Sequence, residues 1–406
     1  MIQKAFGDIT KTDIDFLIDT KVGESKTLEY KETLPGSKDS DKKEFLADVS
    51  SFANASGGDL IYGIKAALTD EGKKKGEPEE VVPLQDITAD EAKLQIENLI
   101  RTGIEPRISV HVKEIAGYGD ASNGFVILVR IPQSFASPHM VTFKNSSRFY
   151  CRNSAGKYQL DVQEIRSAFL ATDSQADRIR SFLQDRLAKI MADETPIELS
   201  MPHRLVLHIL PLNSFLNQKR LNFGADRNLT LNFRPIAVSG WDHRYNLDGF
   251  LTYRDSRETK LCDSYCQTFF DGTIEAVYAD ILTTNSGQKP QSGDTAFIAS
   301  IAYEKYVIEA IRNYFKGYNT LGVEAPVVIS MALLGCKGAY MYADIAMGLD
   351  NYPIDRDVAI LPEVQTANLD EDVPTIMKPI FDAVWNACGH PRSYNYTQNG
   401  TWNVRL

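Results

Sequence analysis

Residues 24–64 predict a strand, a helix and a second strand in direct succession, and this order constrains the fold of the first half more than any other feature. Apolar and charged side chains alternate through residues 27–33, as they do in a strand with one face in water. A helix then begins near residue 39 and ends at Gly57 and Gly58, because such glycines allow the left-handed turn that closes a helix. Residues 60–64 follow as a buried strand.

Three charged side chains make this segment a candidate functional site. Glu29 and Lys31 are two residues apart, so both point to one face of an extended chain. Glu24 has the opposite parity and joins them only if the chain bends between residues 23 and 26. Such a group is either a phosphate or metal site or an ordinary sheet edge, since charged residues also guard edges against mispairing.

The length of 406 residues exceeds what a single core usually supports, so we expect two domains. The order of the predicted elements indicates the α/β class, of the mixed α+β kind. We expect a mixed sheet with helices over residues 1–172, a helical connector over 173–195, and a mixed α/β domain of unknown role over 196–406.

Several segments carry a specific structural expectation. The polar stretch 69–83 reads as a solvated loop. Two separate helices are expected over residues 161–170 and 174–191, and a long amphipathic helix over 295–315, closed by Gly317. Strands are also expected over residues 104–113, 124–131 and 147–152.

The formal net charge of −10 argues against a general polyanion binder but not against a local one, because affinity for phosphates depends on where the cations lie. Residues 101–160 hold eight Lys or Arg against three Asp or Glu, with Phe143, Phe149, Tyr150 and Tyr158 among them. Basic residues interleaved with aromatic ones suit a groove for single-stranded nucleic acid. A strand with one wet face gives the same pattern, so both interpretations stay open.

Several classes of protein are disfavoured. The five cysteines are too scattered for a disulfide framework, and Cys262 and Cys266 have no second Cys or His pair to complete a zinc site. The first ten residues carry no apolar signal, and no apolar run approaches the length of a membrane span. The phosphate-binding patterns G-x-x-x-x-G-K-S/T and G-x-G-x-x-G are absent, so ATP would need an unusual pocket. We therefore expect a cytoplasmic protein that does not contact membranes.

Several motifs occur in an order that resembles a known family. They are L-E-Y-K-E at 28–32, F-A-N-A-S-G-G at 52–58, D-L-I-Y-G-I at 59–64, I-E-P-R-I at 104–108, V-R-I-P-Q-S-F-A-S-P-H at 129–139 and R-F-Y-C-R at 148–152. Together they resemble the Schlafen/AlbA-type nucleic-acid-binding domain of bacterial proteins, over about residues 10–170. H-I-L-P-L at 208–212 and Asp248-Gly249 are similar to the C-terminal region that often accompanies this domain.

This resemblance implies binding of DNA or RNA, in a regulatory or defence role. A binding module would contact phosphates through its basic side chains and stack a base on an aromatic ring. The candidates are Lys31, Lys65, Arg107, Arg130, Arg148 and Arg152 for phosphates, Tyr150 or Phe149 for stacking, and His139 in a loop that could reach the groove.

The resemblance also implies a second function, because some Schlafen proteins are RNases that cut tRNA or rRNA with three acidic residues and a divalent cation. Glu24 and Glu29 match two of those acids at the same spacing and would bind Mg²⁺ or Mn²⁺. Lys31 would then stabilise charge in the transition state.

The third acid of such a nuclease is expected at position 65, which holds a lysine here. The ammonium of Lys65 would repel a metal ion and could instead contact a phosphate oxygen directly. Asp59 and Asp70 are the acids that could substitute. Simple binding is therefore the leading hypothesis, with a metal-dependent endoribonuclease as the alternative.

A third hypothesis is a scaffold or sensor that acts as a homodimer through its C-terminal half. The apolar residues of the helix expected over 295–315 spread more widely than a single core stripe requires. A core helix buried on two sides explains this pattern equally well.

Overall fold

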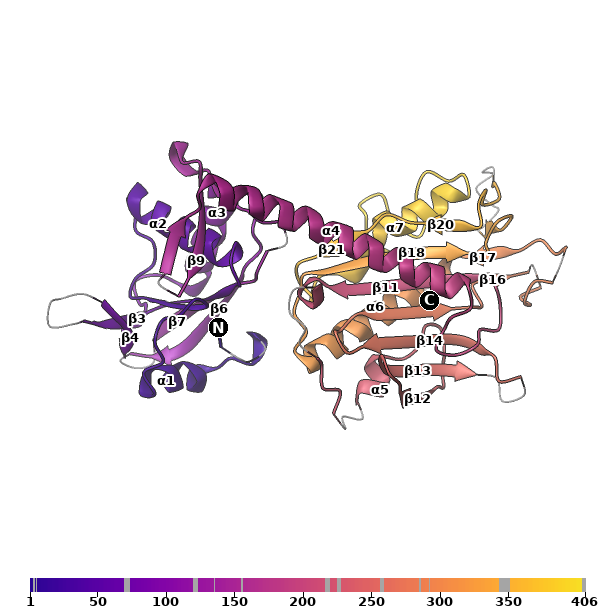
Figure 1. The fold of residues 1–406 in the computed structure, drawn as a ribbon, viewed down its shortest axis with the longest axis horizontal. Helices are drawn as coiled ribbons and strands as arrows, with labels where there is room; N and C mark the ends of the chain where they lie inside the picture. The colour runs from indigo at the N-terminus through magenta and orange to yellow at the C-terminus, as the bar shows by residue number, and fades with distance from the viewer. Residues whose placement is uncertain are drawn as a thin grey trace. The chain divides into compact units, whose positions relative to one another are not determined.

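The computed structural model describes the chain except for residues 3, 5, 69–73, 120–122, 135, 155, 216–219, 225–227, 256–258, 285, 292, 343–350 and 404–406. Contacts between residues divide the chain into two compact units, Met1–Asp177 and Arg178–Leu406. Both units combine helices with sheets, which confirms the expected mixed α/β class (Figure 1). The division falls inside one long helix, α4 (Val162–Met191).

The N-terminal unit is built on two four-stranded sheets and a hairpin. Its elements before α4 are η1 (Phe6–Asp8), α1 (Lys11–Asp19), β1 (Leu28–Lys31), α2 (Asp39–Ala53), β2 (Gly58–Tyr62), β3 (Ile64–Leu68), β4 (Lys74–Val81), α3 (Ala89–Gly103), β5 (Ile104–Glu105), β6 (His111–Tyr118), β7 (Gly124–Ile131), β8 (Met140–Val141), η3 (Phe143–Asn145), β9 (Arg148–Asn153) and β10 (Gly156–Gln159).

The first sheet has the strand order β1-β2-β7-β6. β1 and β2 are parallel and α2 connects them, because parallel neighbours need a crossover. Apolar residues of α1, such as Ile14, pack on one face of the sheet against Leu28 and Leu128. Those of α2 and α3, such as Phe52 and Ile96, pack on the other face. The strand, helix and strand predicted over residues 24–64 are thus confirmed.

The second sheet has the order β10-β9-β8-β5 and is antiparallel throughout. The strand expected over residues 104–113 is wrong, since β5 ends at Glu105 and β6 begins at His111 in the other sheet. The loop expected over residues 69–83 is also wrong in part, because β3 and β4 form a hairpin. Lys65 faces Glu80 across this hairpin. Ion pairs between the two strands therefore help to stabilise a hairpin whose sequence is largely polar.

The C-terminal unit is built on one large sheet with the order β12-β13-β14-β15-β11-β18-β20, in which β21 also pairs with β18. Its elements are β11 (Arg204–Pro211), η4 (Leu212–Phe215), α5 (Asn228–Asn232), β12 (Asp242–Tyr245), β13 (Gly249–Asp255), β14 (Cys262–Phe269), β15 (Ile274–Tyr278), β16 (Leu282–Thr283), β17 (Phe297–Ala299), α6 (Ser300–Leu321), β18 (Val327–Leu334), β19 (Tyr340–Tyr342), β20 (Val358–Ile360), β21 (Val364–Thr366) and α7 (Val373–Ala387).

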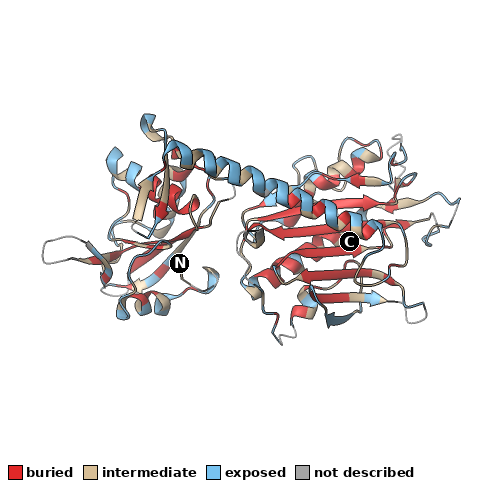
Figure 2. Ribbon diagram, in the orientation of Figure 1, coloured by how far each residue is buried: buried red, intermediate tan, exposed pale blue. Residues whose placement is uncertain are grey.

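Both faces of this large sheet are buried. Along β11, Leu205 and Leu207 pack with α6 and α7, whereas Val206 between them packs on the opposite face with the end of α4. Successive side chains of a strand point to opposite faces, so an uninterrupted apolar run is what a sheet covered on both sides requires. Figure 2 shows the strands of the sheet largely buried and much of α4 exposed.

Two expectations about helices need correction. The separate helices expected over residues 161–170 and 174–191 form one helix, α4, because the residues between them include no glycine or proline to break it. The long helix α6 does not end at Gly317 but continues to Leu321, and Gly322 closes it in the left-handed conformation, with φ of +67°. A β-carbon on Gly317 would lie 2.4 Å from the ring of Phe233, so this glycine allows close packing.

All five cysteines are free thiols. Within the described ranges, the helices are too short or too polar to cross a membrane.

Candidate functional site

Six charged side chains from four elements of the N-terminal unit meet in one place, which we call the charged cluster. The cluster comprises Glu29 and Lys31 of β1, Glu44 and Asp48 of α2, Arg152 of β9 and Lys157 of β10. Local sequence explains the convergence. Glu29 and Lys31 share one face of β1, Glu44 and Asp48 lie one turn apart on α2, and Lys157 pairs with Arg152 across an antiparallel register.

Ammonium groups join the carboxylates of the cluster in a chain. Nζ of Lys31 lies 2.6 Å from Oε1 of Glu29 and 3.0 Å from Oδ2 of Asp48. Nζ of Lys157 lies 2.7 Å from Oδ1 of Asp48 and 2.8 Å from Oε1 of Glu44. The side chain of Asp48 is 2% exposed and is therefore a buried carboxylate shared by two cations.

Arg152 completes the cluster from the other side. Its Nη2 lies 2.5 Å from Oε2 of Glu29, and its guanidinium group lies 4.0 Å from the centre of the Phe52 ring. Nε and Nη1 of Arg152 are buried and have no hydrogen-bond acceptor among the described residues. Two donors of one guanidinium group thus remain to be satisfied by a water molecule or an oxyanion.

The environment displaces the pKa values of the two inner acids in opposite directions. Burial alone would raise the pKa of Glu29, but Lys31 and Arg152 lower it below its ordinary value. Burial raises the pKa of Asp48, and the negative charge of Glu29 raises it further. Burial would lower the pKa of Lys31, yet Asp48 and Glu29 raise it, so this lysine stays charged. The surroundings thus move the pKa values of two neighbouring acids apart, downward for Glu29 and upward for Asp48.

Sequence reasoning missed Asp48. The residue lies on the apolar side of α2, between the buried residues Phe45, Val49 and Phe52. Carboxylates are rarely buried without a partner, so an acid on the core face of an amphipathic helix was the available signal.

Three carboxylates and three cations give the cluster no formal net charge, so it is not a ready-made cationic trough. Lys31 and Arg152, both predicted to contact phosphates, are engaged with Glu29. A phosphate would have to displace that carboxylate to reach them.

The bend expected before β1 is present. A turn pairs Ser25 with Leu28 and returns the chain on itself. Oε1 of Glu24 accepts a hydrogen bond from the backbone N–H of Tyr30 at 3.1 Å, at the outer edge of β1. Glu24 thus lies along the strand, whereas the carboxylate of Glu29 points to Lys31 and Arg152.

The acids do not fit the Mg²⁺ or Mn²⁺ site that the sequence suggests. Both oxygens of Glu29 contact cations, and Lys65, at the position of the expected third acid, binds Glu79 at 3.2 Å and Glu80 at 3.0 Å. Asp59 is fully buried against Arg130, and Asp70 lies outside the described residues. Within the described part of the chain, no group of three or more His, Cys, Asp or Glu side chains is placed to hold a metal ion.

Two other predicted contact residues are buried. Arg130 is 2% exposed, with its Nε 2.8 Å from Oδ1 of Asp59 and its Nη groups donating to the backbone carbonyls of Ile2 and Lys4. His139 is fully buried, with Nδ1 2.6 Å from the carbonyl oxygen of Pro106, and burial lowers its pKa. Both residues therefore hold the fold together in this structure, contrary to the expectation that they reach a ligand.

The remaining candidates lie in the second sheet. Arg107 follows β5 and is exposed. Arg148 begins β9, is exposed, and donates from Nη1 to the neutral Oε1 of Gln159 at 2.8 Å. Tyr150 and Phe149 are half-buried: Tyr150 packs against the core beside α2, and the ring of Phe149 meets that of Phe169 edge to face. The two arginines are thus the predicted cations with no carboxylate partner among the described contacts.

The F-A-N-A-S-G-G motif has a structural role here. The side chain of Asn54 donates to the carbonyl oxygens of His139 (3.0 Å) and Tyr150 (2.8 Å), and accepts from the N–H of His139 (2.7 Å). Gly57 has φ of +67°, and a β-carbon there would lie 2.6 Å from the backbone nitrogen of Gln133. The motif thereby joins the end of α2 to both sheets.

A second polar feature lies between α2 and α3. It is an open cleft of about 610 Å³ whose lining includes Lys42 and Arg101 together with Ser37, Asn98 and Thr102. Nη2 of Arg101 donates to Oδ1 of Asn98 at 2.7 Å, and the described residues that line the cleft include no carboxylate.

Comparison with known proteins identifies one family. Residues 24–161 match the family described as Schlafen, AlbA_2. Among solved structures, the N-terminal domain of a RecG-related protein from Nitrosomonas europaea is 19% identical, with 38% of this chain and 94% of that chain covered and a TM-score of 0.27. The DIP2311 protein from Corynebacterium diphtheriae is 15% identical, with 36% of this chain and only 26% of that chain covered and a TM-score of 0.24. No curated protein matches.

Proposed function

Because residues 24–161 form a Schlafen/AlbA-type domain, we propose that the N-terminal unit binds a strand of RNA or DNA. The contacts come from exposed basic side chains that have no carboxylate partner, rather than from those engaged in the charged cluster. The observation that carries this proposal is the division of the basic residues into these two classes.

The paired class comprises Lys31, Lys65, Arg130, Arg152 and Lys157. A phosphate that approaches one of these side chains must compete with a carboxylate already in contact. For Arg130 and Arg152, burial adds a second obstacle. These residues therefore shape the unit and contribute little direct contact.

The unpaired class includes Arg107, which follows β5, Arg148 of β9, and Lys42 and Arg101 in the cleft between α2 and α3. A phosphate contact at these side chains breaks no ion pair among the described residues. Each such contact releases a counterion from the nucleic acid, which adds about 0.7 to 0.9 to the steepness of a log–log plot of affinity against salt.

The test is fluorescence anisotropy of the full-length chain with labelled single-stranded RNA and DNA, from low to physiological salt. We expect binding that weakens steeply as the salt concentration rises. Binding with a flat salt response, or none at low salt, would contradict the proposal.

Cleavage of the bound strand is a second candidate. The observation in its favour is that Glu29 and Asp48 share the ammonium of Lys31 while their pKa values are displaced in opposite directions. In this second candidate, one of the two acids accepts a proton from the nucleophile and the other donates one to the leaving oxygen.

Incubation of tRNA with the purified protein, with Mn²⁺ or Mg²⁺ added or with EDTA, tests this second candidate. The variant Glu29→Gln should abolish cleavage, whereas Glu32→Gln, an exposed neighbour outside the cluster, should leave it intact. Cleavage that survives Glu29→Gln would assign the activity to another site or to a contaminant.

The apolar pattern that suggested a homodimeric scaffold has another explanation in the structure. The apolar residues that made the 295–315 segment look broad are mostly buried: Ile298, Ile308, Ile311 and Phe315 lie in the core of the C-terminal unit, and Ile301 is 48% exposed. A helix buried on more than one side accounts for the pattern.

A further inference from the structure

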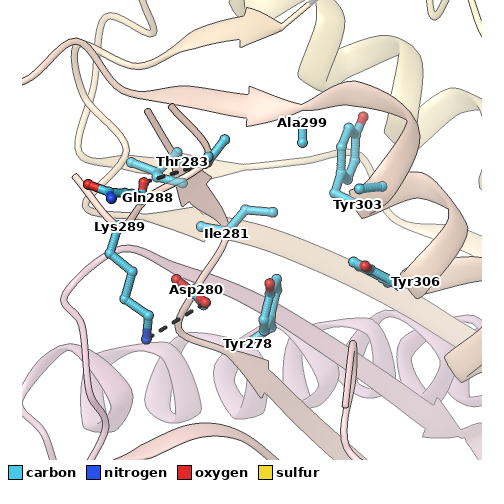
Figure 3. Close-up of a pocket in the computed structure, with 12 residues that line it drawn as sticks. Tyr278, Asp280, Ile281, Thr283, Gln288, Lys289, Ala299, Tyr303 and Tyr306 are labelled. Atoms are coloured by element: carbon cyan, nitrogen blue, oxygen red, sulfur yellow. Dashed lines mark hydrogen bonds and ion pairs between the residues drawn. The ribbon is translucent and has the colours of Figure 1, made fainter. Parts of the chain in front are cut away.

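The C-terminal unit contains a cavity of about 250 Å³ that the proposed function does not use (Figure 3). It lies between the end of β15, the segment that follows it through β16 to Lys289, and the first turns of α6. Its wall combines aromatic rings with the carboxylate of Asp280 and the ammonium of Lys289, and this combination indicates a ligand.

Tyrosine rings form one side of the cavity. Tyr278 ends β15, and its ring centre lies 6.5 Å from that of Tyr306 on α6, with the rings almost perpendicular. Tyr303 lies one turn before Tyr306, and Phe381 holds its ring edge to face at 5.7 Å. Ile281 completes the apolar part of the wall. Tyrosine rings present negative electrostatic potential on their faces, which attracts a cation.

Asp280 supplies the charge at this wall. Its nearest described cation is Lys289, whose Nζ lies 3.7 Å from Oδ2 of Asp280 but only 2.8 Å from Oδ1 of Asp263. Lys289 is therefore shared between the two carboxylates and lies closer to Asp263, and Arg254 also acts on the charge of both acids. Burial raises the pKa of Asp280, Lys289 lowers it and Asp263 raises it, so that the pKa stays above its ordinary value.

We propose that this cavity binds a small organic cation, an ammonium or guanidinium group on a short apolar body. The charged group pairs with Asp280, and the body packs against Tyr278, Tyr306 and Ile281. An anion would meet the carboxylate of Asp280 and the negative faces of the rings, while Lys289 is already engaged. A neutral ligand would use the rings and leave the charge of Asp280 uncompensated.

Isothermal titration calorimetry of the full-length chain tests this assignment with three probes of nearly equal shape: 2-phenylethylammonium, the neutral 2-phenylethanol and the anion phenylacetate. We expect the ammonium to bind at least about tenfold more tightly than either analogue, because only it pairs with Asp280. Equal affinity for the three probes, tighter binding of phenylacetate, or no heat from the ammonium at millimolar concentration would overturn the proposal.

Variants separate the two parts of the site. Asp280→Asn should weaken the ammonium about tenfold and leave 2-phenylethanol unchanged, whereas Asp355→Asn, the same charge change at an exposed ion pair elsewhere in the unit, should have no effect. Tyr306→Leu should weaken the ammonium, and Tyr306→Phe, which keeps the ring, should not. Retained affinity in both Asp280→Asn and Tyr306→Leu would contradict the site.

Discussion

At the scale of single residues, Asp48 organises the charged cluster because the ammonium groups of both Lys31 and Lys157 contact its carboxylate. A buried acid with two cationic partners links β1, α2 and β10, which the main-chain hydrogen bonds of one sheet do not join. Asp48 should therefore stabilise the N-terminal unit without favouring its binding to nucleic acid.

The variant Asp48→Asn should destabilise the N-terminal unit by about 1–3 kcal/mol, since it weakens two contacts to partly buried cations. It should also leave nucleic-acid affinity unchanged or slightly increased, because it removes a negative charge. Urea unfolding and anisotropy measure the two effects. The matched control is Asp39→Asn on the same helix, whose side chain is 51% exposed and contacts Lys144 at 3.2 Å, so its stability should change little. A loss of affinity in Asp48→Asn without loss of stability would contradict a structural role.

The sequence pointed to the charged residues of the N-terminal unit, but it did not show which residues they pair with. Arg130 was expected to contact a ligand, yet it lies directly opposite Asp59 in the register of β2 and β7. The register between strands that are 70 residues apart depends on the whole sheet, so neither residue reveals its partner alone. The basic residues of β9 and β10 pose the same problem, because the acids that neutralise Arg152 and Lys157 come from β1 and α2.

At the scale of elements, strong apolar patterns predicted structure well and polar ones did not. The strand expected over residues 124–131 coincides with β7, which is buried along its whole length. The hairpin of β3 and β4 escaped prediction because most of β4 is polar. Cross-strand ion pairs of Lys65 and the burial of Ile64 both stabilise its described part. Gly317 shows that sequence-based prediction can also misread a residue within a helix. A glycine is needed at this position because the ring of Phe233 approaches closely, and not because the helix ends there.

The variant Gly317→Ala should lower the stability of the C-terminal unit by about 1 kcal/mol. Alanine favours the helix by roughly 1 kcal/mol, but overpacking against Phe233 costs about 1–3 kcal/mol. Chemical denaturation measures the change, and the companion variant Phe233→Leu should relieve the clash. The effects of the two substitutions should therefore be less than additive in the double variant. A stabilising Gly317→Ala would show that the ring moves aside without cost.

The end of α4 docks on the large sheet through a buried carboxylate. Glu275 of β15 accepts two hydrogen bonds from Arg186 of α4, at 2.7 and 2.8 Å, and one from Tyr265 at 2.9 Å. Burial alone would raise the pKa of Glu275, but Arg186 and His208 lower it to about 2.

A lowered pKa stabilises the fold only while the carboxylate is ionised. This contribution is fully present above the ordinary pKa of a glutamate, about 4.3, and is lost as the pH falls toward about 2. At 1.36 kcal/mol per unit, a shift of roughly two units contributes on the order of 3 kcal/mol. Unfolding free energies of the wild type and of Glu275→Gln, measured at intervals between pH 7 and pH 3, should show a smaller decline in the variant. Parallel curves would contradict this role.

At the scale of the whole molecule, the two units have separate cores and carry separate sites. The net charge of −10 describes their sum and hides the local arrangement, in which most acids and bases of the charged cluster neutralise each other. Binding of a sugar-phosphate strand then depends on a few unpaired cations rather than on total charge.

The most direct test of this account is the salt dependence of single-stranded RNA affinity for matched double variants of the full-length chain. Removing the unpaired Arg107 and Arg148 as glutamines should weaken binding and reduce the log–log slope by about 1.4, since each contact with a single strand contributes about 0.7. Replacing the paired Lys65 and Lys157 by glutamine changes the net charge equally and should leave the slope nearly unchanged. Equal slopes for both double variants, or a larger loss in the second, would contradict the account.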